Sequence, residues 1–190
     1  MIRALGPLAS VALTLGALQA RAEVRFDDPM AAFETVCLSD PDAQGAALAP
    51  EMRKMSRDQI AAWAATTGAD PTLVRQAYAF EAGGAAMVLV QDATPETCMI
   101  AGEGTATAAD FAARWNEYVQ DPAKGFRAKE PADAQTPRRV SGFASKPQDG
   151  RFVQITGHRH EWGETGLVIL LSALVKDTPA SCALWPEECD

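Results

Sequence analysis

The stretch VRQAYAFEAGGAAMVLVQDATPETCMIA, from Val74 to Ala101, decides the fold class. It contains three short runs rich in β-branched, aromatic and other apolar residues, separated by Gly83-Gly84 and by a polar segment around Pro95. Paired glycines between two such runs are typical of a β-hairpin turn. We therefore expect three strands here, at 74–80, 85–90 and 97–101.

The region that follows repeats this order of elements. Thr107 and Asp110 form a capping box, and Phe111, Trp115 and Tyr118 then mark the buried face of a helix that ends by residue 122. Three more strands are predicted, at 139–145, 151–158 and 167–176. The fold class is therefore α+β, with a mostly antiparallel sheet of about six strands backed by helices.

Helices are expected before the first strand. Asp28-Pro29 is a helix start that places Phe33 and Cys37 on one face, and the helical signals resume from 42 to 65 with a capping box at Ser56 and Gln59. Because a capped helix precedes each set of three strands, a duplicated α-β-β-β unit is a further hypothesis. The proline-rich segment 121–139 has no apolar period and is predicted to be a mobile loop.

The N-terminus has the features of a cleavable signal peptide. Arg3 precedes an apolar run from Ala4 to Ala17, and the small residues of Ala20-Arg21-Ala22 suit signal peptidase, so we place the signal peptide at 1–22 and one domain at 23–190. The run is shorter than the roughly 20 apolar residues of a membrane-spanning helix. The sequence thus predicts a soluble periplasmic or secreted protein with no membrane contact after cleavage.

The mature chain is strongly acidic. Cleavage removes two arginines and no acid from a chain of net charge −8, which leaves −10. This charge repels phosphate backbones and anionic membrane surfaces, so nucleic acid is excluded as a partner class. A cationic protein or a metal ion remains compatible with it, although acidity can also serve solubility alone.

Four cysteines, Cys37, Cys98, Cys182 and Cys189, lie in the mature chain. An even number of cysteines in an exported protein indicates two disulfides. The chain contains no C-x-x-C motif, so the cysteines do not indicate a zinc site. Three pairings are possible. We favour Cys37–Cys98 with Cys182–Cys189, because the last two lie close together beside Pro186, where the chain must turn.

His158 and His160, the only histidines, are the candidate metal ligands. Alternate residues of a strand share a face, so both imidazoles could chelate a metal with Glu161 or Glu164. His-x-His alone is a weak signal, and solvent-exposed turn histidines are the alternative that we favour. We assign no metal site and no cofactor.

The chain has no G-x-S-x-G, S-x-x-K or complete phosphate-binding glycine loop, so no catalytic residue is assigned. We expect a non-catalytic module that binds a protein or a small ligand on its sheet. The alternatives are a metal-binding protein that uses His158 and His160, and a hydrolase whose acidic residues only the fold brings together.

The chain resembles a group of small exported proteins of unknown function from Gram-negative bacteria. The resemblance lies in an F-x-x-x-C helix from Phe33 to Cys37, a tryptophan-containing helix, a strand pair and the strand Cys98-Met99-Ile100, mainly within residues 26–120. It implies a periplasmic location and supports the Cys37–Cys98 pairing. It implies no activity.

Overall fold

The computed structural model describes residues 25–39, 51–67, 69–92, 97–104, 107–136, 139–162 and 165–189. The predicted signal peptide and residues 42–50 of the expected helical region lie outside these ranges. Among the described helices, none has the length and apolar character needed to cross a membrane.

The chain forms one continuous sheet with helices on both of its faces. The strands are β1 (Arg25–Phe26), β2 (Arg53–Lys54), β3 (Val74–Ala82), β4 (Ala85–Asp92), β5 (Thr97–Gly104), β6 (Asp133–Thr136), β7 (Arg139–Gln148), β8 (Arg151–Trp162) and β9 (Thr165–Val175). The helices are α1 (Pro29–Phe33), the π-helical turn η2 (Glu34–Leu38), α2 (Arg57–Thr67), α3 (Ala108–Gln120), the 3-10 turn η4 (Pro122–Lys124), α4 (Pro179–Leu184) and the 3-10 turn η5 (Pro186–Glu188).

The sheet order is β1-β3-β4-β5-β9-β8-β7-β6, and β2 pairs with β3 beside β1. All pairings are antiparallel except β1 with β3. Two meanders, β3-β4-β5 and β7-β8-β9, meet where β5 pairs with β9. The α+β class and the mostly antiparallel sheet agree with the prediction. The described residues hold nine strands rather than about six, because three strands of two to four residues extend the edges.

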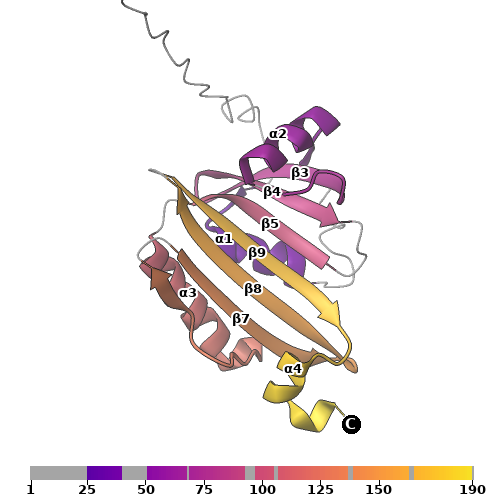
Figure 1. The fold of residues 1–190 in the computed structure, drawn as a ribbon, viewed down its shortest axis with the longest axis vertical. Coiled ribbons are helices and arrows are strands. Elements are labelled where there is room, and N and C mark those ends of the chain that lie inside the picture. Colours follow the sequence, from indigo (N-terminus) through magenta and orange to yellow (C-terminus); the bar gives the residue numbers. More distant parts are fainter. Residues whose placement is uncertain are drawn as a thin grey trace, which may run out of the picture.

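The helices cover the two faces of the sheet unequally. On the first face, α1, η2 and α3 pack over both meanders and form the larger core, which includes Phe33, Trp115 and Ile155. On the second face, α2 packs Ile60 and Trp63 against β3, β4 and β5. In Figure 1, α1 lies behind the sheet, α2 lies over the β3–β4 end, and α4 lies at the lower ends of β7 and β8. Helix α4 is on the second face, where Gln154 of β8 donates hydrogen bonds to the hydroxyls of Thr178 and Ser181.

The helix starts follow from local side-chain chemistry. Asp28 accepts hydrogen bonds from the backbone amides of Met30 and Ala31, and Pro29 occupies the first helical position. Ser56 with Gln59 and Thr107 with Asp110 form the two reciprocal capping boxes. These caps were all predicted, because each depends on residues three positions apart or fewer.

Two segments differ from the prediction. Arg53–Lys54 is strand β2 rather than helix, because it pairs with Tyr78 and Ala79 on β3. The segment 121–139 is not structureless: it contains η4 and β6, and it buries Phe126 and Ala132 in the main core. Asn116 of α3 fixes this segment by accepting a hydrogen bond from the amide of Ala132 (2.7 Å) and donating one to its carbonyl (2.9 Å).

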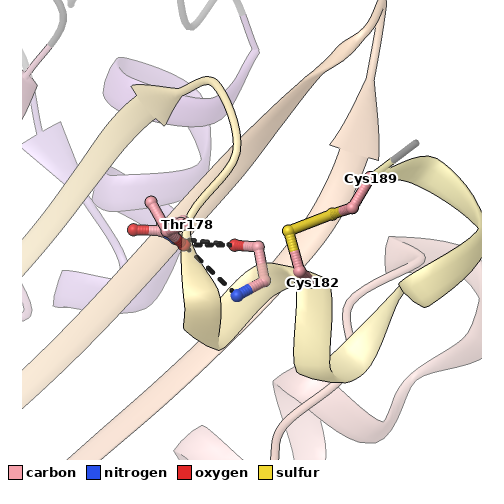
Figure 2. The surroundings of a disulfide bond; sticks show 5 residues. Thr178, Cys182 and Cys189 are labelled. Carbon is pink, nitrogen blue, oxygen red and sulfur yellow. Dashed lines mark hydrogen bonds between the residues drawn. A yellow bond between two sulfur atoms is a disulfide. The ribbon is translucent and has the colours of Figure 1, made fainter.

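The structure contains the disulfides Cys37–Cys98 and Cys182–Cys189, which is the pairing favoured from the sequence. The first joins η2 to β5 within the core. The second joins α4 to the residue after η5, and Thr178 caps α4 by accepting a hydrogen bond from the amide of Ser181 (Figure 2). Helix α4 also rests on the sheet, since the indole of Trp185 donates to the carbonyl of Ser145 on β7 (3.3 Å).

Candidate functional site

Strand β9 is apolar on both of its faces. Its sequence from Leu167 to Val175 reads LVILLSALV, with Ser172 as the single polar residue. Val168, Leu170 and Leu174 are buried under α1 and η2, on the first face. The alternate residues point to the second face, where all are half-buried: Leu167, Ile169, Leu171, Ala173 and Val175.

The neighbouring strands extend this apolar row sideways. The register places Leu171 of β9 between Met99 of β5 and Thr156 of β8, and Thr156 beside Phe143 of β7. All four side chains are half-buried. We call this second face of β9, β8 and β7, together with Met99, the open face.

The open face continues the smaller core under α2. Met99 and Ile169 both pack against the cluster that Ile60 and Trp63 of α2 form with β3 and β4. Apolar surface therefore runs from beneath α2 onto residues 167–171 of β9, and α4 lies further along the same face, where Gln154 bonds Thr178 and Ser181.

One end of the open face is polar. His158 and His160 point to this face from β8, where they pair by register with Ser141 and Arg139 of β7. Both imidazoles and Arg139 are exposed. Partial desolvation, and then the positive charge of Arg139, lower the pKa of His158. Arg139 adds a positive charge at this end.

The structure places the two candidate metal ligands on one face without completing a site. His158 and His160 do share a strand face, but they lie within β8 rather than in a turn. In the described parts of the chain, no three His, Cys, Asp or Glu side chains are grouped closely enough to hold a metal ion. Glu164 and the side chain of Glu161 lie outside the described residues. The cation opposite His160 also opposes metal binding electrostatically.

A cleft lies on the first face, between α1 and α3. It is an open cleft of about 600 Å³ lined by Glu34, Arg114, Tyr118 and Lys124, among others. Both of its cations are paired across the helices: Arg114 with Asp28 at 2.6 Å, and Lys124 with Glu34. Burial, and then Glu34 and Asp121, raise the pKa of Tyr118 well above its ordinary value, so this phenol is not an acid–base group near pH 7. These two ion pairs join α3 and η4 to α1 and η2.

The sequence of β9 indicates that both faces of this strand are apolar, but it does not show where on the sheet the open face lies. A strand that is apolar on both faces is normally covered on both faces. The run LVILLSALV therefore indicates a covering layer on each face of the sheet. The predicted helices behind the sheet provide a layer on one face only. Tertiary packing, which no local pattern encodes, decides how much of the second face α2 covers.

No protein-family model matches the chain, and a search of curated proteins finds no significant match.

Proposed function

We propose that the protein is a non-catalytic binding module that docks a partner protein on the open face. One observation carries this proposal: the second face of β9 is apolar, and over residues 167–171 it remains half-buried between α2 and α4, which bonds Gln154 of β8 at the other end of this face. Exposed apolar area of this kind, bordered by polar residues, is characteristic of protein interaction sites. Met99 and Phe143 add the large side chains that anchor such contacts.

Site-specific photo-crosslinking tests this proposal. A photoreactive residue at Thr156, in the middle of the open face, is expected to give a discrete adduct in cells, whereas one at Ala113 on the outer side of α3 is not. The partner is then identified, purified and titrated against the protein. Leu171→Glu is expected to weaken that binary affinity at least tenfold, because it places a charge in a desolvated contact.

Thr156→Arg is the matched variant, since it changes the same face without removing an apolar side chain. Circular dichroism and thermal melts establish that both variants fold. Unchanged affinity in both folded variants, or equal adducts from positions 156 and 113, would contradict docking on this face.

We also infer that the protein works outside the cytoplasm, after cleavage following Ala22. The leader sequence and the two disulfides support this location, because structural disulfides persist in oxidising compartments. Sequencing the N-terminus of the protein from a periplasmic fraction is expected to begin at Glu23. An intact Met1 on protein from the cytoplasmic fraction would contradict export.

The arrangement of the two meanders supports an ancestral duplication as a further proposal. Each meander has three long strands, and β5 and β9, the last strand of each, pair antiparallel in the middle of the sheet. The equivalent helices in this proposal are α1 with η2 and α3, since both lie on the first face. Helix α2, which the sequence pairs with α3, lies on the second face instead.

A further inference from the structure

A small cavity lies on the first face of the sheet, at the start of α1. It has a volume of about 230 Å³ and lies between α1, the β3–β4 turn, the end of β5, α3 and β9. Drug-sized ligands occupy cavities of about 300–1,000 Å³, so this cavity suits a smaller molecule. The ion pair between Arg114 and Asp28 lines both this cavity and the open cleft between α1 and α3, so the two hollows are neighbours.

Backbone contacts hold the walls of the cavity in place. Strand β1 pairs with the end of β3, and the amide of Gly83 donates a hydrogen bond to the carbonyl of Phe26 (2.9 Å). Gly83 has a φ of 60°, and a Cβ atom there would lie 3.2 Å from the carbonyl oxygen of Asp27. The β3–β4 turn is thus fixed against the start of α1, and binding between them does not require a loop to be ordered.

The floor of the cavity is apolar. Ala82 of β3, Phe111 of α3 and Val168 of β9 belong to the main core and also line the cavity. The half-buried Met30 of α1 lines it as well. Removing apolar surface from water stabilises a complex, so this floor favours an occupant with an apolar body.

The charges around the cavity favour a cation. Asp28 uses one carboxylate oxygen to cap α1 and the other to accept a hydrogen bond from Arg114 (2.6 Å), so these two charges balance. Asp27 and Glu103 also line the cavity, and both are exposed. Neither forms an ion pair within the described residues. Their two negative charges are therefore unbalanced at the cavity.

We propose that this cavity binds a small organic cation, a primary ammonium group attached to a short apolar body. The apolar body packs on Ala82, Phe111 and Val168, and the N–H groups of the ammonium donate to the carboxylates of Asp27 and Glu103. The apolar floor and the unbalanced carboxylates are separate observations, and a molecule of this class satisfies both.

Titrations of ¹⁵N-labelled mature protein, followed by NMR, test this proposal. The ligands are n-butylammonium, 1-butanol and butyrate, which have similar apolar bodies and differ in charge. We expect n-butylammonium to give saturable shifts of the amide signals of Gly83 and Ala85, with an affinity at least tenfold higher than that of 1-butanol. Butyrate is expected to give no saturable shifts, because the carboxylates repel it.

Three substitutions assign the binding to the cavity. Ala85 is the cross-strand partner of Ala82 and shares its face, so Ala85→Leu is expected to fill the cavity and to weaken n-butylammonium binding at least tenfold. Glu103→Gln is expected to weaken n-butylammonium about threefold and to leave 1-butanol unchanged. Glu117→Gln is the matched control, since it removes the same charge from the neighbouring cleft, and it is expected to change neither affinity.

Equal affinities of n-butylammonium and either of the other two ligands would overturn the proposal. Equal weakening by Glu103→Gln and Glu117→Gln would also overturn it, because the cation would then follow the overall charge of the protein. Circular dichroism establishes that the variants fold, and unchanged binding in folded Ala85→Leu would place the ligand outside the cavity. None of these results bears on docking at the open face, which lies on the other side of the sheet and is tested by photo-crosslinking.

Discussion

Replacing Trp115 with alanine is expected to lower the free energy of unfolding by about 3–5 kcal/mol, the usual range for a large aromatic residue in a core. Trp115 is 0% exposed and lies flat between α3 and the sheet. Beneath it lie Gly142 of β7 and Gly157 of β8, which are cross-strand partners. The two glycines form a flat platform, because a Cβ atom at Gly142 would lie 2.3 Å from the indole Nε1 and one at Gly157 would lie 2.6 Å from the ring.

Neither glycine of this platform has a side chain that could fill the space that the indole leaves. Trp115 also stacks on Phe111, with ring centroids 6.3 Å apart, so the substitution leaves Phe111 without this neighbour. Urea unfolding followed by circular dichroism measures the loss. The buried indole N–H has no hydrogen-bond partner, so Trp115→Phe removes no hydrogen bond. We expect Trp115→Phe to lower the free energy of unfolding clearly less than Trp115→Ala does. A loss below about 1 kcal/mol for Trp115→Ala would contradict this account of the core.

The second large effect is expected from the Cys37–Cys98 disulfide. Replacing both cysteines with alanine is predicted to lower the free energy of unfolding by about 2–5 kcal/mol. The bond closes a loop across 61 positions, where the chain-entropy argument gives roughly 4 kcal/mol, and it ties η2 to the strand next to β9. The sulfurs of Cys37 and Cys98 lie in the main core, so their removal also loosens packing there.

Cys182→Ala with Cys189→Ala is the matched control. That bond spans only 7 positions, for which the same argument gives roughly 2.5 kcal/mol. Helix α4 has other attachments as well: Trp185 is bonded to Ser145, and Arg127 stacks on its ring at 3.6 Å. We expect this control to lower the free energy of unfolding less than the replacement of Cys37 and Cys98 does. Urea unfolding of both variants measures this, after peptide mapping without reduction has verified the bonds, and an equal or larger loss in the control would contradict the argument.

The sequence predicts best where the cause is local. The capping boxes at Ser56 and Thr107 need only neighbouring residues, and the strands of both meanders follow from runs of apolar residues between turns. Contacts between distant residues account for the differences. Phe126 is buried because the segment after α3 folds back under that helix, although the sequence around it is proline-rich and charged.

The candidate site was predicted only in part for the same reason. Alternation along 151–158 and beyond places His158 and His160 on one face, and the apolar run at 167–176 predicts a strand, as the structure has them in β8 and β9. That α2 would cover β3–β5 and stop short of β9 depends on how far its short apolar face reaches across the sheet. Arg139 becomes part of the site only through the register of β7 with β8.

The position of β9 sets the order in which the protein can be completed during synthesis. It is the last of the described strands in sequence, yet it lies in the middle of the sheet, between β5 and β8. Until β9 is made, β5 and β8 each present an unpaired edge, and no strand pairing connects β3-β4-β5 with β7 and β8. A nascent chain therefore cannot close its sheet before β9 has emerged. Loss of β9 would divide the sheet into two parts rather than trim its edge.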